Sequence, residues 1–136
     1  MAATEPASQR FPMPAWHDTA VMMASPIDRL REICLALPEA HEQFTWDIPT
    51  FRVRGKIFVM ASEDGASPAF SCKAPPGAQE ILVGADPERF FVPPYVGKSG
   101  WIGVKLHAGA DWEQLSGFIA DSYRMTAPMK LAALMA

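Results

Sequence analysis

The residues of this chain that could do chemistry are basic side chains and one tryptophan, on segments with the pattern of strands. Segments 50–60, 70–73 and 93–106 contain six Lys or Arg residues and neither Asp nor Glu. Guanidinium forks bind phosphate in a bidentate fashion, and an indole ring can stack on a nucleic-acid base. The composition of these segments therefore predicts a surface for anions around Trp101.

The segment 93–106 changes its pattern at Trp101. Before it, prolines, glycines and Tyr95 are typical of an irregular loop. From Trp101 onward Ile102, Val104 and Leu106 alternate with Trp101, Gly103 and Lys105, which indicates a strand with one apolar face. The same alternation elsewhere places further basic residues on the face away from the core. The predicted nucleic-acid-binding residues are Arg52, Arg54, Lys73, Trp101 and Lys105, with Lys98 at their rim.

Two other interpretations use the same face of the sheet. In the first, the face is only solvated, and the long basic side chains cover apolar groups such as Ile57 and Val59. In the second, the face binds a protein partner or a small ligand, with Trp101 as the anchor. Ionic strength separates phosphate binding from an aromatic anchor, because phosphate binding weakens steeply with salt.

The remaining polar residues predict no catalytic or metal site. His17, His41 and His107 are scattered without the spacing of metal ligands. The glycines of 97–103 lack the Lys-Ser/Thr and helix of a phosphate loop, so we expect them to give backbone freedom and close strand approach. No nucleophile and base form a recognisable pair. We expect a non-enzymatic domain without a metal or cofactor.

The overall composition limits the classes of protein. The chain has 136 residues and is 49% hydrophobic, which fits one domain with a core. The net charge of −3 excludes a basic protein that binds nucleic acid with its whole surface. No apolar run reaches the length of a membrane span, and no secretory signal is visible. We expect a cytoplasmic protein, monomeric or weakly dimeric, with Cys34 and Cys72 reduced in the core.

Two parts of the chain differ in organisation. Residues 1–24 carry several prolines and no sustained period, so they form a tail or extension, from which Phe11, Met13 and Trp16 could dock onto the body or a second copy. Residues 25–136 form the single domain. Its first helix begins at Ser25–Pro26 and ends before Pro38, and its last begins at Asp111 and ends before Pro128.

Between these helices the chain predicts strands and short helices. A strand at 42–46 is interrupted by 47–49, a hairpin follows at 50–62, and a further strand covers 69–73. Short helices begin at 75–76 and 86–88. The predicted turn of the hairpin is Gly55–Lys56, which pairs Val53 with Phe58. The order of elements predicts an α+β two-layer sandwich, with helices packed on one face of an antiparallel sheet.

The sheet residues expected to face the helices are Phe51, Val53, Phe58, Met60, Phe70, Cys72, Ile102, Val104 and Leu106. The helix residues expected opposite them are Ile27, Leu30, Ile33, Leu37, Leu115, Phe118 and Ile119. In the last helix, Tyr123 is expected to pack against the sheet, with its hydroxyl on an acceptor at the rim.

Four ordered motifs resemble the MmcQ/YjbR family. They are Leu35-Ala36-Leu37-Pro38-Glu39-Ala40, Thr50-Phe51-Arg52-Val53-Arg54-Gly55-Lys56-Ile57-Phe58, Pro94-Tyr95-Val96-Gly97-Lys98-Ser99-Gly100-Trp101-Ile102-Gly103-Val104 and Ser122-Tyr123-Arg124. The similarity covers the chain from about Pro26 to the C-terminus. It implies a frataxin-like (CyaY-like) sandwich and a role in DNA binding through a sheet like a double wing. It carries no catalytic residues.

Frataxins bind iron through an acidic first helix. The first helix here has a mixed surface of Asp28, Arg29, Arg31 and Glu32, so iron binding does not transfer. DNA or another nucleic acid is the expected partner, and a protein partner is the alternative.

Overall fold

The computed structural model describes residues 25–64, 67–107 and 110–135. The predictions for the tail 1–24 lie outside these residues. The helices are α2 (Pro26–Leu35), α3 (Ala78–Ala85), α4 (Trp112–Thr126) and α5 (Met129–Ala132), with short 3-10 turns at Gly97–Ser99 and Ala133–Met135. The strands are β1 (His41–Thr45), β2 (Ile48–Val53), β3 (Lys56–Asp64), β4 (Ser67–Cys72), β5 (Phe90–Phe91) and β6 (Ile102–Lys105).

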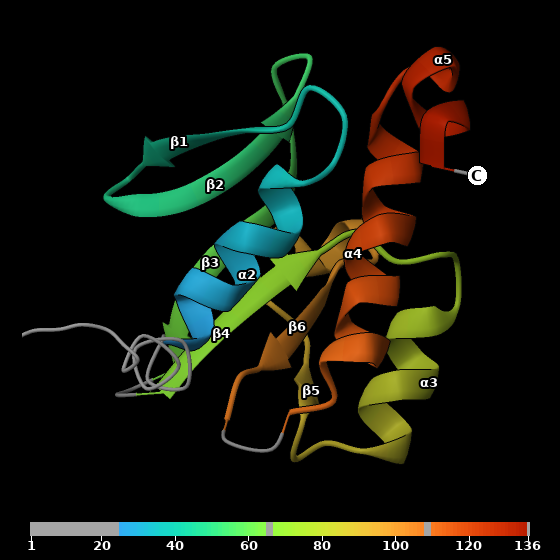
Figure 1. Ribbon diagram of the computed structural model, residues 1–136. Coiled ribbons are helices and arrows are strands. Elements are labelled where there is room, and N and C mark those ends of the chain that lie inside the picture. The colour runs from blue at the N-terminus through green and yellow to red at the C-terminus, as the bar shows by residue number, and fades with distance from the viewer. Residues whose placement is uncertain (1–24, 65–66, 108–109, 136) are drawn as a thin grey trace, which may run out of the picture.

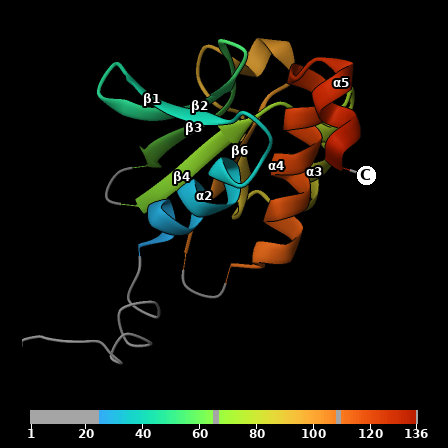
Figure 2. The ribbon, with the colours of Figure 1, turned by 45° about the horizontal axis from the view of Figure 1, so that its top comes forward.

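The strands form one antiparallel sheet in the order β1-β2-β3-β4-β6-β5. Helices α2 and α4 lie across one face of this sheet, and α3 lies beside α4 near β5 (Figures 1 and 2). The core between the layers contains the buried Leu30, Leu115 and Ile119 of the helices. The α+β two-layer prediction is therefore confirmed.

Local capping signals explain the limits of the two long helices. Ser25 Oγ accepts from the backbone N–H of Asp28 at 3.0 Å, and Pro26 occupies the first turn, where no amide partner is needed. Asp111 caps α4 in the same way, accepting from Gln114 N at 3.2 Å. Both helix starts are where the sequence predicts them.

The β2–β3 hairpin differs from its prediction at the turn. Its two turn residues are Arg54 and Gly55, with φ of 52° and 80°, and Val53 pairs with Lys56. Positive φ at both positions is the geometry of a type I′ turn, which matches the twist of the flanking strands. The predicted turn at Gly55–Lys56 is therefore wrong by one residue.

A β-bulge at Phe58 then shifts the register back. Arg52 pairs with Ile57 and Phe51 with Val59, which leaves Phe58 as an extra residue on β3. Phe58 and Val59 consequently both lie in the core with no exposed surface. Beyond the bulge the alternation is reversed. Met60, predicted in the core, lines the opposite face instead.

Two further predictions about elements are wrong. Residues 47–49 do not interrupt the sheet, because Trp46 and Asp47 form a tight turn with φ of 53° and 64° and β2 begins directly at Ile48. Asp86 does not begin a helix either. Its carbonyl accepts from the N–H groups of Arg89 and Phe90, which closes a single turn before β5.

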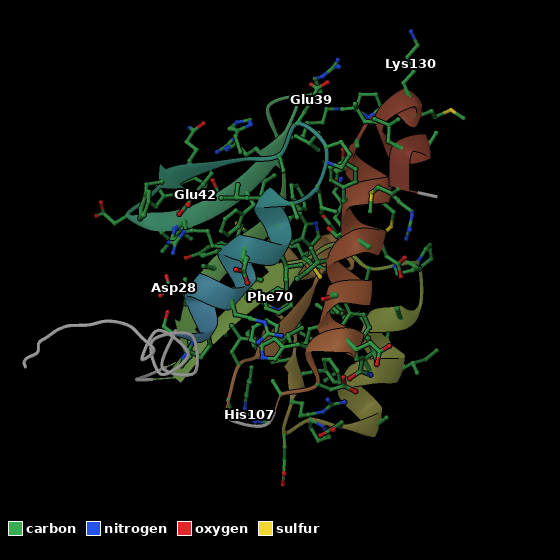
Figure 3. The ribbon with its side chains drawn as sticks, in the orientation of Figure 1. Asp28, Glu39, Glu42, Phe70, His107 and Lys130 are labelled. Atoms are coloured by element: carbon green, nitrogen blue, oxygen red, sulfur yellow. The ribbon has the colours of Figure 1, made fainter. Side chains whose placement is uncertain are left out.

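The strands β4 and β6 follow the predicted alternation. Their core-facing residues are Phe70, Cys72, Ile102 and Val104, followed by Leu106 just beyond β6. Figure 3 shows Phe70 on the side of the sheet that carries α2 and α4. Cys34 and Cys72 are free and fully buried, and this burial raises the pKa of both thiols.

Ser122 and Tyr123 fasten α4 to the rest of the domain. The Ser122 hydroxyl donates to the carbonyl of Phe58 at 2.6 Å and accepts from Lys73 N–H at 2.9 Å. The Tyr123 hydroxyl donates to the carbonyl of Pro38 at 2.6 Å, and its ring meets Phe58 edge to face. The predicted role of Tyr123 is confirmed, and Ser122 satisfies a carbonyl that the bulge removes from the strand ladder.

Candidate functional site

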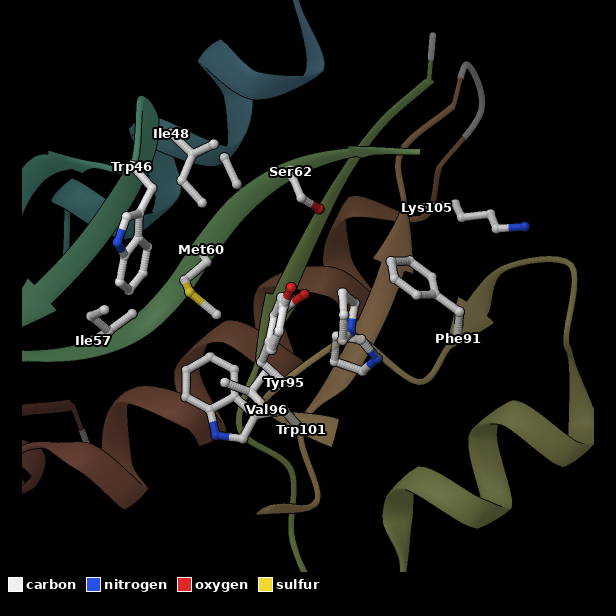
Figure 4. A pocket seen from close by; sticks show the side chains of 14 residues that line it. Trp46, Ile48, Ile57, Met60, Ser62, Phe91, Tyr95, Val96, Trp101 and Lys105 are labelled. Carbon is white, nitrogen blue, oxygen red and sulfur yellow. The ribbon is translucent and has the colours of Figure 1, made fainter. Parts of the chain in front are cut away.

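The face of the sheet opposite α2 and α4 carries a cavity of about 1070 Å³ (Figure 4). Its floor comes from residues that alternate with the core positions of β2, β3, β4 and β6. Most of the lining side chains are apolar or aromatic. They are Trp46, Ile48, Ile57, Met60, Ala61, Ser62, Ser71, Phe91, Pro93, Pro94, Tyr95, Val96, Trp101 and Lys105.

The cavity has exposed aromatic rings from two separate loops. Trp46 comes from the β1–β2 turn and is 78% exposed, and Tyr95 comes from the loop before β6 and is 94% exposed. Figure 4 shows Trp46 above Ile57 and Met60, with Tyr95 on the other side of Met60. Two rings held in water at the edge of an apolar hollow can contact whatever enters it.

Gly103 makes room for one wall of the cavity. A Cβ atom at Gly103 would lie 2.4 Å from the Phe91 ring, so only glycine lets that ring lie against β6. Phe91 on β5 pairs with Gly103 and contributes to the lining. The missing side chain at Gly103 makes room for the Phe91 ring, and this determines the shape of the site.

The loop that carries Tyr95 is fixed by a glutamine of α3. Gln79 Nε2 donates to the carbonyl of Gly97 at 2.9 Å and to that of Trp101 at 2.7 Å. The Gly97 carbonyl lies at the start of the 3-10 turn and the Trp101 carbonyl lies two residues beyond its end, so one side chain holds both sides of the turn. The α3 helix thereby positions the wall of the cavity.

Two of the six predicted binding residues line the cavity, namely Trp101 and Lys105. Trp101 is on the predicted face, but it is only 7% exposed. The prediction of an exposed tryptophan is therefore wrong for this residue. Trp46 is the exposed tryptophan of the site.

The two arginines have different surroundings. Arg52 lies on the predicted side of β2, and its guanidinium donates to the hydroxyls of Thr50 and Thr45 and to the carbonyl of Gly55, at 3.0 to 3.3 Å. Arg54 lies in the turn and forms a bidentate pair with Glu39, at 2.7 and 3.1 Å. The prediction of an unpaired basic cluster is therefore wrong for Arg54.

The Arg54–Glu39 pair is exposed at the rim of the domain, and Figure 3 shows Glu39 beside the β2–β3 turn. The hydrogen bonds and charge of Arg54 lower the pKa of the Glu39 carboxyl. Lys73 follows β4 and Lys98 lies in the 3-10 turn, both outside the lining of the cavity. The basic residues are thus dispersed around the sheet.

Sequence reasoning missed most of the aromatic lining. Phe91 and Trp46 lie in segments assigned to a helix region and an interrupted strand, and Tyr95 lies in an aperiodic loop. Adjacent positive φ at Trp46 and Asp47 has no glycine or asparagine to signal it. Within 25–64, 67–107 and 110–135, no cluster of three metal-ligating side chains occurs. Among the same residues, no helix has the length and apolar character needed to span a bilayer.

Comparison with known proteins identifies the family. A family model named YjbR matches residues 35–125. This chain belongs to the YjbR family. None of the curated proteins matches it. Among solved structures, the crystal structure of Deinococcus radiodurans protein DR2400, a DUF419 domain, is similar with a TM-score of 0.65 and 25% identity, covering 74% of this chain and 80% of that one.

Proposed function

We propose that this YjbR domain binds a small apolar ligand on the open face of its sheet. The observation that carries the proposal is the cavity of about 1070 Å³, lined by Trp46, Phe91, Tyr95 and Trp101. Ligand sites are typically concave, mainly apolar and up to about 1,000 Å³ in volume, with a few polar groups. Within the described residues α2 and α4 cover the opposite face of the sheet, while Gln79 and Gly103 shape this one.

The geometry favours an apolar ligand over a phosphate backbone. A phosphate site needs several cations in one place, because each neutralised phosphate adds to affinity. Among the lining residues Lys105 is the one with a positive charge, and Arg54 already binds Glu39. Aromatic and aliphatic side chains, by contrast, make up most of the lining.

Nucleic-acid binding is the second candidate, and the exposed rings of Trp46 and Tyr95 favour it. Exposed aromatic rings beside a cationic groove bind single strands by stacking, with about 1–3 kcal/mol per base. In this alternative Lys105 and Arg52 meet phosphates, with Lys73 and Lys98 further out. Such binding needs unstacked bases, so it favours single strands over duplex.

Fluorescence of the neutral dye N-phenyl-1-naphthylamine tests the first candidate. We expect saturable binding that Trp46→Ala weakens about threefold or more, since a partly buried aromatic contact contributes on the order of 0.5–1.5 kcal/mol. The matched control is Phe44→Ala. Phe44 is 64% exposed on the neighbouring strand but does not line the cavity. Equal affinities for the two variants would contradict the proposal.

Oligonucleotides separate the two candidates. Anisotropy of a labelled single strand at 50 and 200 mM salt should show no binding, or only weak binding, if the cavity serves an apolar ligand. Each phosphate contact contributes about −0.7 to the log–log salt slope for a single strand. A slope of about −2 or steeper that Arg52→Ala flattens would favour nucleic acid instead.

A further inference from the structure

The cavity presents two large aromatic side chains to solvent from unusual backbone positions. Trp46 and Tyr95 are largely exposed, and their φ angles are 53° and 68°. A bulky residue seldom adopts this left-handed conformation, because its Cβ atom crowds the backbone. Exposed apolar area and unfavourable backbone geometry both cost free energy, and both mark surfaces that bind something. A segment that covered the two rings would bury their apolar surface.

The matching segment is the run Phe-Pro-Met-Pro-Ala-Trp at 11–16, which lies outside the described residues. It carries two aromatic rings, two prolines and no charged side chain, and the lining of the cavity is mostly aromatic and aliphatic. Proline fixes its own φ, so a proline-rich segment loses little entropy when it binds in an extended form. Aromatic-lined grooves recognise such segments in several peptide-binding domains. The composition of 11–16 therefore suits this cavity.

The segment 11–16 is also close enough in the sequence to reach the cavity. Ser25, where the described chain begins, lies nine residues after Trp16, and nine residues span at most about 30 Å. That is about the diameter of a small domain. Helix α2 begins beside the start of β4, where β3 ends (Figures 1 and 2). Ser62, two residues before the end of β3, lines the cavity, so Ser25 lies at the end of the sheet that carries Ser62.

We propose that segment 11–16 binds in the cavity of its own chain, with an aromatic ring of the segment against Trp46 and Tyr95. The segment then acts as an internal competitor, because an external ligand must displace it before binding. This inference rests on the proposed function, since it concerns the occupancy of the same cavity. Weak intrinsic affinity is enough, because a short linker gives the segment an effective concentration of about millimolar.

The affinity of the full chain for N-phenyl-1-naphthylamine measures this competition. We expect the double variant Phe11→Ala with Trp16→Ala to bind the dye about fourfold more tightly than the unmodified protein. This factor corresponds to a segment that occupies the cavity for about three-quarters of the time, which leaves one-quarter of the molecules free to bind the dye. The matched control is Val21→Ala with Met22→Ala. It removes two apolar side chains of the same tail from outside the segment, and the affinity should stay unchanged.

Methyl NMR spectroscopy locates the competition without the dye. The double variant should shift the methyl signals of Ile57 and Met60, which line the cavity, and leave those of Ile81 and Met129 in place. The gain in dye affinity should not depend on protein concentration, since the segment and the cavity belong to one chain. A gain that increases with protein concentration would show that the segment of a second copy binds instead, and would overturn the proposal.

The outcomes for the inference and for the proposed function differ. Equal dye affinity of the unmodified protein and the double variant, or a gain that the control matches, would overturn the internal competitor, while the proposed function stands. If the dye binds neither protein, the proposed function fails and the inference fails with it. A thermal melt of each variant confirms folding, and Trp16→Ala alone keeps the test decisive if the double variant does not fold.

Discussion

Replacing Ser122 by alanine removes the connection between α4 and the bulged strand. The Ser122 hydroxyl is fully buried and bonds the Phe58 carbonyl at 2.6 Å and the Lys73 N–H at 2.9 Å. The Phe58 carbonyl lies at the bulge and Lys73 lies just beyond β4, so neither group has a regular strand partner there. Ser122→Ala therefore removes the hydrogen-bond partner of both the Phe58 carbonyl and the Lys73 N–H.

The magnitude follows from the burial of these two groups. An unsatisfied buried backbone group costs about 1–3 kcal/mol. The bond to Phe58 is buried and that to Lys73 is partly buried, which places their sum at about 3–4 kcal/mol. Alanine is a better helix former than serine by about 0.5 kcal/mol, which offsets part of the loss. We expect the free energy of unfolding to fall by about 2.5–3.5 kcal/mol.

Urea denaturation followed by tryptophan fluorescence measures this change. Ser116→Ala is the control, because Ser116 lies in the same helix, is half-buried and has no side-chain hydrogen bond within the described residues. It gains the same helix propensity without losing a partner, so its stability should be unchanged or slightly higher. A difference below about 0.5 kcal/mol between the two variants would refute the assigned role of Ser122.

Three further predictions concern the core, the loop and the rim. Phe58→Ala should cost about 3–5 kcal/mol of unfolding free energy, since the ring is fully buried against Tyr123; a loss below about 1 kcal/mol in chemical denaturation would show that the ring is not a core element. Gln79→Leu removes the two hydrogen bonds that the Gln79 amide donates to the loop. It should lower the free energy of unfolding by about 1–2 kcal/mol and weaken dye binding; unchanged dye affinity would show that this loop does not form the site. Glu39 has a lowered pKa in the folded protein, so its contribution to the free energy of unfolding is complete above its unfolded pKa and is lost as pH falls through the folded pKa. The difference in melting temperature between Glu39→Gln and the unmodified protein should therefore be present at pH 7, shrink as pH falls below the unfolded value of about 4.3, and disappear once pH is below the folded pKa of Glu39. A gap that persists below both values would contradict the ion pair with Arg54.

The elements with local signals could be predicted from the sequence. Ser25 and Asp111 specify helix starts through their own side chains, and the alternation in β4 and β6 specifies which residues face the helices. These signals act over a few residues, so no knowledge of the tertiary structure is needed to read them.

The β2–β3 hairpin shows which part of a register error matters. The turn lies one residue earlier than predicted, so Val53 pairs with Lys56, but Phe58 is two residues from Lys56 and stays on the side of Phe51 and Val53. Phe58 therefore faces the helices as predicted, and the bulge changes only the residues that follow it. Past the bulge Val59 is in the core and Met60 is in the cavity, the reverse of the prediction. The bulge depends on Ser122 of α4, which donates to the freed Phe58 carbonyl. Ser122 lies far from Phe58 in the sequence, so no local pattern signals the bulge.

The site could be predicted only in part. The alternation places Trp101 and Lys105 on the open face, but it cannot position the loop of Tyr95 or the turn of Trp46, which have no period. Counting charges on the strands alone also misses Glu39, which lies before β1 and binds Arg54. The cavity is therefore a property of the folded chain that the sequence pattern does not reveal.

Methyl NMR spectroscopy tests the central claim most directly, because it locates a bound ligand residue by residue. Titration with N-phenyl-1-naphthylamine should shift the methyl signals of Met60, Ile57 and Ile48, which line the cavity, in a saturable way. Met129 and Ile81 are the internal controls, since they are 88% and 70% exposed and lie outside the cavity. Saturable shifts at the first set with none at the controls are the predicted result. Shifts of equal size at Met129 and Ile81, or none at Met60, would contradict a ligand site on the open face of the sheet.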